Sequence, residues 1–431
     1  MNNKNSNEIF DVIVIGGGAS GLMAAGRAAE LGKNVLILEK NKKLGEKLRI
    51  TGGGRCNITN AEDDVHVLLK HYGKAEQFLY SPFSQFGVKD TFSFFESRGL
   101  PLVVQARKRA FPHTEKAFDV YAVLEKYIKK GNVAVKMDSP VTRVVSNYAN
   151  NKITSVMCGK TEYKAENFIV ATGGVSHPET GSTGDGFSWL EKLGHTISKP
   201  TPTVVPLAVA EKWVKDLAGV SLSFMKITFF VEGKKQFAKT GKILFTHFGI
   251  SGPLILNTAG AVGDLLHDGI VTATIDAFPD TDHGSLETKI IKVFDKNKNK
   301  MFKNILPDIV PAGTAPSILS LLKESISGST SLTINPDIKV HSITKEQRKI
   351  IMQLLKALPL TITGLMGYDR AVVSDGGLVM TEIDTKTMKS KIVENLFVTG
   401  DLLNINRPSG GYSLQLCWTT GYVAGSHAAS Q

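Results

Sequence analysis

The 431-residue sequence predicts an α/β fold, with one discontinuous parallel-sheet domain, an inserted antiparallel β-barrel and a small helical domain. Three observations predict this layout. Both ends of the chain alternate short apolar strands with helical patterns, as parallel sheets do. Short alternating segments with turn signals fill the middle, and a lysine- and asparagine-rich stretch beyond them has helical periodicity. We expect 1–195 and 365–431 to form the first domain, 196–283 and 331–364 the barrel, and 284–330 the helical insert.

The first element is FDVIVIGGGASGLMAAGRAAELGKNVLILEK at 10–40, which predicts a strand, a glycine turn, a helix and a second strand. Gly16 permits the tight turn, Gly18 lets the backbone approach a pyrophosphate, and Gly21 lets the helix pack close to the strand. The helix N-terminus offers free N–H groups, and Glu39 can accept hydrogen bonds from an adenosine ribose. The stretch therefore predicts a Rossmann-like dinucleotide-binding domain for FAD or NAD. We expect Ala19, Ser20 and Lys40 to contact the ligand as well.

Two later stretches favour FAD over NAD, because FAD is longer and needs contacts from distant parts of the chain. ENFIVATGGVSHPETGSTGDG at 166–186 predicts a strand that enters a glycine turn and then precedes an amphipathic helix. NLFVTGDLLNINRPSGGYSLQLCWTTGYVAGSHAA at 395–429 predicts a strand, an acidic turn, and a glycine pair that opens a long helix. The cofactor contacts expected here are Ala171, Thr172, Gly173, Gly400, Asp401, Gly410, Gly411, Tyr412 and Ser413.

A second glycine cluster lies in LRITGGGRCNITN at 48–60. A run of glycines lets backbone N–H groups approach a flat ring or a diphosphate, so we expect this loop beside the cofactor. The residues expected to contact the cofactor are Lys47, Gly53, Gly54, Arg55, Cys56 and Asn57. Cys56 has no partner cysteine a few residues away, so a dithiol relay is not expected. A single catalytic thiol and a small residue packed near the ring both stay open for Cys56.

Further stretches bear on a helix start and on catalysis. VHSITKEQRKIIMQLLKALPLTI at 340–362 predicts a strand and then a helix, with Thr344 and Gln347 as a capping box. His247, in the loop FTHFGISGP, can donate a proton or bind a substrate oxygen, and Arg109, in RAFPHT, is the other leading catalytic candidate. The alternative for His247 is ordinary packing at a turn.

The net charge of +11 fits nucleic acid, an anionic membrane surface or anionic small molecules. The lysines are scattered, so we expect a solvated basic surface, and nucleic acid is not an expected partner. The three cysteines are far apart and outside any zinc spacing, so no metal site is expected. No apolar run reaches the ~18–20 residues of a membrane span, and the first residues lack a secretion signal. We therefore expect a cytoplasmic protein without a membrane partner.

The order GGGASGL, EKNKKLGEKLRITGGGRCNITN, RAFPHT, ATGGVSHPETGSTGDG, ILFTHFGISGP and SGGYSLQLCWTTGYVAG covers nearly the whole chain. It resembles the BaiN/YhiN-type, aminoacetone-oxidase-like family of bacterial FAD-dependent oxidoreductases, within the glutathione-reductase-like flavoproteins. The resemblance implies a three-part layout, with Asp401 on the ribitol and the following helix start at the flavin pyrimidine edge. Family members usually carry Glu at that position, so the shorter acid departs from the pattern.

The resemblance implies an FAD-dependent oxidoreductase that passes a hydride through flavin N5 on a small organic substrate. NAD(P)H or oxygen is the second substrate expected. No second GxGxxG occurs, so NAD(P)H would dock transiently. Two alternatives stay open: a flavin-dependent RNA-modifying protein and a non-catalytic flavin-binding protein.

Overall fold

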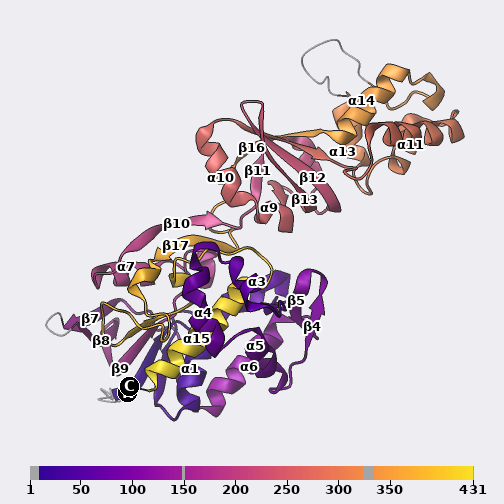
Figure 1. The fold of residues 1–431 in the computed structure, drawn as a ribbon. Helices are drawn as coiled ribbons and strands as arrows, with labels where there is room; N and C mark the ends of the chain where they lie inside the picture. Colours follow the sequence, from indigo (N-terminus) through magenta and orange to yellow (C-terminus); the bar gives the residue numbers. More distant parts are fainter. Residues whose placement is uncertain (1–8, 148–150, 324–333, 431) are drawn as a thin grey trace. The chain divides into compact units, whose positions relative to one another are not determined.

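The computed structural model describes residues 9–147, 151–323 and 334–430. The chain forms two compact units, Met1–Pro202 with Tyr368–Gln431, and Thr203–Gly367 (Figure 1). The first boundary lies later than the expected 195, because β10 (Ile197–Thr203) pairs with β17 (Val373–Leu378) and adds to the first unit. The barrel and the helices after it both lie within the second unit.

The first unit is built on a seven-stranded sheet with five parallel strands. Its apolar strands are buried on both faces, as parallel strands between helices are. Val14 sits at the centre of the sheet, opposite Ile37 on one side and Ile169 on the other. The parallel strands are β6 (Ala134–Lys136), β2 (Val35–Leu38), β1 (Ile9–Ile15), β9 (Thr161–Val170) and β18 (Leu396–Val398); β8 (Lys152–Cys158) and β7 (Arg143–Asn147) extend β9 antiparallel.

Two helices from opposite ends of the chain pack against each other in this unit. They are α1 (Ala19–Glu30) and α15 (Tyr412–Ala428), which lie side by side in Figure 1. A Cβ on Gly421 would lie 2.4 Å from the Ser20 carbonyl oxygen, and one on Gly425 would lie 2.3 Å from that of Ala24. Glycine at both positions is therefore required for this close approach.

Shorter elements complete the first unit. A three-stranded antiparallel ribbon consists of β3 (Thr59–Asn60), β5 (Arg109–Pro112) and β4 (Leu102–Gln105). The remaining helices are α2 (Glu46–Ile50), α3 (Val65–Lys70), α4 (Glu76–Gln85), α5 (Val88–Glu96), α6 (Ala117–Lys130) and α7 (Asp185–Lys192).

The second unit contains a closed antiparallel barrel, which confirms the predicted barrel. Its strands alternate buried and exposed side chains, with Ile227, Phe229 and Val231 facing inward along one strand. The strand order is β11 (Leu207–Val209), β14 (Gly249–Ser251), β13 (Lys234–Thr246), β12 (Ser221–Val231), β15 (Val271–Asp276) and β16 (Leu358–Leu365).

Helices follow the barrel strands, as expected for 284–330, although 324–330 lie outside the described residues. The predicted capping box is confirmed: Thr344 Oγ1 accepts from the Gln347 N–H at 3.2 Å, and Gln347 Oε1 accepts from the Thr344 N–H at 3.0 Å. The strand expected from residue 340 is wrong. A short 3-10 turn lies there, because the Ile343 N–H donates to the Val340 carbonyl at 3.1 Å. The helices are α8 (Lys212–Asp216), α9 (Pro253–Leu256), α10 (Ala259–Asp268), α11 (His283–Lys296), α12 (Phe302–Ile305), α13 (Ala315–Lys323) and α14 (Lys345–Lys356).

Within the described ranges, we find no helix with the length and apolarity needed to cross a bilayer.

Candidate functional site

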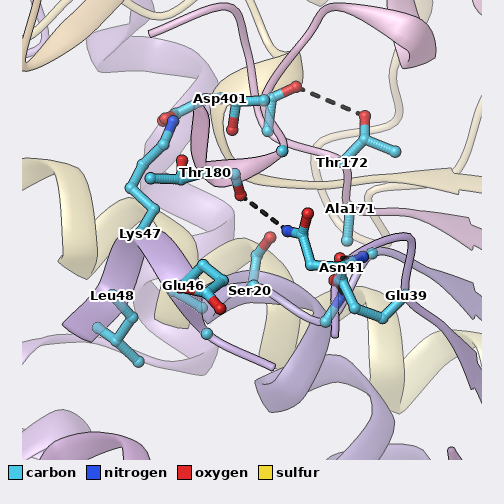
Figure 2. A pocket seen from close by; sticks show the side chains of 18 of the residues that line it. Ser20, Glu39, Asn41, Glu46, Lys47, Leu48, Ala171, Thr172, Thr180 and Asp401 are labelled. Atoms are coloured by element: carbon cyan, nitrogen blue, oxygen red, sulfur yellow. Dashed lines mark hydrogen bonds between the residues drawn. The ribbon is translucent and has the colours of Figure 1, made fainter. Parts of the chain in front are cut away.

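A pocket opens in the first unit at the carboxyl ends of β1, β2 and β9, where α1 begins. Its empty volume is about 1150 Å³, including the solvent-facing part, which is large enough for a dinucleotide. Figure 2 shows Glu39 and Asn41 toward one end and Lys47 and Asp401 toward the other. Twelve of the predicted contacts line it: Gly16, Gly18, Ala19, Ser20, Glu39, Lys40, Lys47, Ala171, Thr172, Gly173, Asp401 and Ser413.

The three motif glycines have three different surroundings. Gly16 has a φ of +105°, and a Cβ there would lie 2.6 Å from the Ala171 carbonyl oxygen. A Cβ on Gly21 would lie only 1.9 Å from the Gly16 carbonyl oxygen, so the helix needs glycine to meet the turn. A Cβ on Gly18 would meet nothing within 4 Å. The protein therefore does not itself require glycine at Gly18, and the open space beside it suits a ligand's pyrophosphate.

Glu39 follows β2 and holds the edge of the pocket. One carboxylate oxygen accepts from the Gly17 N–H at 2.7 Å, and the other accepts from the Asn41 N–H at 2.8 Å. Burial raises the pKa of Glu39, although these two bonds favour the ionised form. A ribose at this edge would meet a fixed acceptor. Lys40 beside it is held by Asp185, with Nζ and Oδ2 2.7 Å apart.

The other end of the pocket is polar, and its charged side chains are paired with one another. Asp401 pairs with Arg407, which is 3% exposed and also donates from Nε to Ser413 Oγ at 3.1 Å. Lys47 donates from Nζ to Ser176 Oγ at 3.1 Å. Burial lowers the pKa of Lys47, and the Asp401 carboxylate opposes this effect. These groups offer both donors and acceptors, which suits a hydroxylated chain such as ribitol.

The start of α15 reaches the same pocket through Ser413 and Leu414. Gly411 has a φ of +103°, and a Cβ there would lie 2.3 Å from the Thr59 carbonyl carbon. Tyr72 donates from its hydroxyl to the Tyr412 carbonyl at 2.9 Å and fixes the first turn. Five predicted contacts do not belong to the pocket wall: Gly21, Gly400, Gly410, Gly411 and Tyr412.

Most of the GGGRCN loop does not contribute to the pocket wall. Thr51 lines the pocket, but the structure places Gly53, Gly54, Arg55, Cys56 and Asn57 outside its wall. The Arg55 guanidinium instead pairs with Glu115 and lies 4.4 Å from the Phe111 ring centroid. Gly52 and Gly53 have φ values of +59° and +66°, so the glycines here serve a left-handed turn.

Two thiols, Cys56 and Cys417, lie near the pocket, and Cys417 is only partly buried. Cys56 is fully buried, and burial raises its pKa to about 12. Cys417 lines the pocket one helical turn after Ser413, and burial raises its pKa to about 12 as well. Both thiols are therefore protonated near neutral pH, which disfavours a nucleophilic role.

The pocket includes neither Arg109 nor His247, the other two catalytic candidates. His247 belongs to the second unit, where it is exposed in the turn between β13 and β14 and lies against the Phe248 ring. Arg109 begins β5 and donates from Nε to the Ala106 carbonyl at 3.1 Å.

Several lining residues were not named from the sequence. The Asn41 amide donates to the Thr180 carbonyl at 2.9 Å and joins two walls of the pocket. The TGSTGDG stretch signalled this region but not its individual contacts. Arg407, which pairs with Asp401 behind the pocket wall, had a weak signal, an arginine two residues before the SGG turn. The lining residues missed include Asn41, Glu46, Thr51, Ser139, Val141, Thr180, Ser182, Asp185, Trp189, Val373 and Cys417.

The cofactor that fits this site is FAD. The open cradle at Gly18, the carboxylate of Glu39 and the polar end at Asp401 follow one another along a single pocket. The fold and the site together define an FAD-dependent oxidoreductase. The chain belongs to the family described as HI0933-like protein Rossmann domain, whose model matches residues 10–427.

Two curated relatives span almost the whole chain. A 3-dehydro-bile acid delta(4,6)-reductase from Clostridium scindens is 28% identical over 97% of this chain and 98% of its own length. A ribosomal RNA dihydrouridine synthase from Haemophilus influenzae is 29% identical over 95% of this chain and 96% of its own length.

Among solved structures, the chain is similar to 3-ketosteroid-delta4-(5alpha)-dehydrogenase from Rhodococcus jostii RHA1. The TM-score is 0.54 at 16% identity, covering 100% of this chain and 99% of that one. This likeness concerns the fold.

Proposed function

We propose that the protein reduces a carbon–carbon double bond conjugated to a carbonyl group, with NAD(P)H as the electron donor. The observation that carries this proposal is the pair of relatives spanning almost the whole chain. One name describes reduction of an unsaturated 3-oxo bile acid, and the other describes reduction of the uracil ring. Both reactions add a hydride and a proton across such a double bond.

The net reaction consumes one NAD(P)H and one proton and converts the double bond into a single bond. Bound FAD supplies the two-electron chemistry that links the nicotinamide to the substrate. The chain's own residues bind and orient the cofactor. Glu39 would hold the adenosine end, Asp401 and Ser413 would hold the hydroxylated middle, and the start of α15 would stabilise negative charge beyond them.

Uridine in ribosomal RNA is the substrate we propose first. The chain carries 51 Lys and Arg against 40 Asp and Glu, an excess that favours a polyanion. This proposal puts RNA ahead of a small molecule, whereas the scattered lysines alone predicted that nucleic acid is not a partner. A small enone is the second candidate, because of the bile acid relative. A cytoplasmic location is part of the proposal for RNA.

The test is anaerobic incubation of the purified protein with NADPH and unmodified ribosomal RNA, followed by nucleoside mass spectrometry for dihydrouridine. A parallel reaction contains a 3-oxo-4-ene steroid instead of RNA. Dihydrouridine in the first reaction supports RNA, and a saturated steroid in the second supports the small-enone candidate. Consumption of NADPH only after oxygen is admitted, with neither product, would overturn the proposal in favour of an oxidase.

A further inference from the structure

The β4–β5 turn holds two consecutive non-glycine residues in the left-handed backbone region. Arg107 has a φ of +61° and Lys108 a φ of +56°. L-residues rarely adopt this conformation, and two in succession are strained. Such strain clusters at binding and active sites, because the surrounding structure keeps it there for a purpose.

The charges on this turn differ in their partners. Lys108 pairs with Glu62 at 2.7 Å, so its ammonium is compensated. Within the part of the chain that the structure describes, no carboxylate lies within ion-pair distance of Arg107 or Arg109. Arg107 is exposed, and Arg109 uses only Nε, toward the Ala106 carbonyl, while its guanidinium lies 5.8 Å from the Phe111 ring. Two guanidinium groups are therefore available on one turn.

This turn is tied to the start of α15. The Asn60 side-chain amide donates to the Arg107 carbonyl at 3.3 Å and to the Gly410 carbonyl at 3.2 Å. Gly410 stands two residues before α15, whose first turn lines the cofactor pocket through Ser413. The strained turn is thus tied through one side chain to the segment before α15, the helix whose first turn lines the pocket.

We propose that Arg107 and Arg109 form a phosphate clamp for the substrate that meets the cofactor, an inference that rests on the proposed function. Guanidinium groups bind phosphate oxygens in a planar, bidentate geometry. The phosphate is either the pyrophosphate of NAD(P)H or a backbone phosphate of RNA. The chemistry is the same for both, and the ligands can be tested separately.

The experiment uses the full-length FAD-loaded protein and three variants: Arg107→Gln, Arg109→Gln and Lys108→Gln. Glutamine keeps an L-residue at each position, and Lys108→Gln is the matched control, since its charge is already compensated by Glu62. Affinity for NADPH is measured from the concentration dependence of flavin bleaching. Affinity for RNA is measured by the anisotropy of a fluorescein-labelled oligouridylate at several salt concentrations. The flavin spectrum and the melting midpoint of each variant report on its fold.

We expect each arginine variant to lower the affinity for one of the two ligands about tenfold or more. Lys108→Gln should lower neither affinity by more than about twofold. Loss of NADPH affinity assigns the clamp to the pyrophosphate. Loss of oligouridylate affinity, with a salt slope lower by about 0.7, assigns it to the RNA backbone. Unchanged affinity for both ligands overturns the clamp, as does an equal loss in Lys108→Gln.

Oligouridylate binding is read without any redox step, and NADPH is read from flavin reduction alone with no RNA present, so the two proposals fail separately. Arginine-dependent binding of oligouridylate without dihydrouridine formation would refute the proposed substrate and leave the clamp standing. Dihydrouridine formation with full activity in both arginine variants would do the reverse.

Discussion

Glu39 is the residue whose contacts are most specific to a dinucleotide site, because each carboxylate oxygen accepts one backbone N–H. Glu39→Gln places an amide donor against one of these N–H groups. We expect the affinity for FAD to fall about 10- to 100-fold, the usual cost of a charge-assisted bond of 1.5–3 kcal/mol. Titration of the apoprotein with FAD measures this. Glu46→Gln, also in the pocket wall, is the control, and an equal loss there would contradict a specific role for Glu39.

The cysteines give a second prediction at this scale. Burial raises the pKa of Cys56 and of Cys417 to about 12, and that of Cys158 to about 11. Thiols with such pKa values are almost fully protonated at pH 8, and protonated thiols alkylate slowly. We expect slow iodoacetamide labelling of the native protein and rapid labelling of all three sites in denaturant. Rapid labelling of native Cys56 would restore it as a reactive thiol.

Individual residues were predictable where their reason is local. The roles of Gly16, Gly18 and Gly21 follow from one turn and one helix, so spacing was enough. Arg407 was not predictable in the same way, because its pairing with Asp401 depends on how the irregular segment between β18 and α15 turns back. The GGGRCN loop stays a prediction, because left-handed turns and ligand cradles both select glycine.

The β1–α1 element makes a prediction that separates binding from folding. Ala fits the φ of −81° at Gly18 and meets no protein atom, so Gly18→Ala should leave the stability of the apoprotein unchanged. Its methyl group would occupy the cofactor's space, and we expect FAD affinity to fall at least about tenfold.

Gly21→Ala is the opposite case, since its Cβ would collide with the Gly16 carbonyl oxygen. We expect destabilisation of about 1–3 kcal/mol even without FAD. Thermal melts of both apoproteins and FAD titrations check the pair. Equal melting losses in the two variants, or full FAD affinity in Gly18→Ala, would contradict the assigned roles.

The type of an element, helix or strand, was predictable more often than the element it packs against. The small residues of the last helix indicated close packing, but only the structure identifies α1 as its neighbour through Gly421 and Gly425. The capping box at Thr344 was readable because both partners lie within one turn. The strand expected from residue 340 was wrong, because the backbone there bonds within its own turn, from the Ile343 N–H to the Val340 carbonyl.

At the scale of the whole molecule, the pocket belongs entirely to the first unit. Replacing Thr203–Gly367 with a short Gly/Ser linker should therefore leave a chain that folds and binds FAD within about tenfold of the full protein. The pairing of β10 with β17 and the 2.7 Å bond from the Tyr368 hydroxyl to the Pro200 carbonyl keep the joined ends ordered. FAD titration of the shortened chain tests this. A folded shortened chain without FAD affinity would show that the second unit completes the site.

The two-part layout followed from a change of pattern along the sequence, from parallel-sheet to antiparallel signals. The boundary itself did not, because β10 alternates like a barrel strand but pairs within the first unit. The scattered lysines indicated a solvated surface rather than a polyanion site, but net charge carries no information about position in the fold.

The most direct test of the central claim is the absorbance spectrum of the purified protein, with the released flavin identified by chromatography. We predict flavin bands near about 375 and 450 nm, release of FAD, and bleaching of the bands by anaerobic NADPH. Absence of flavin, together with no spectral change when FAD is added, would contradict the account.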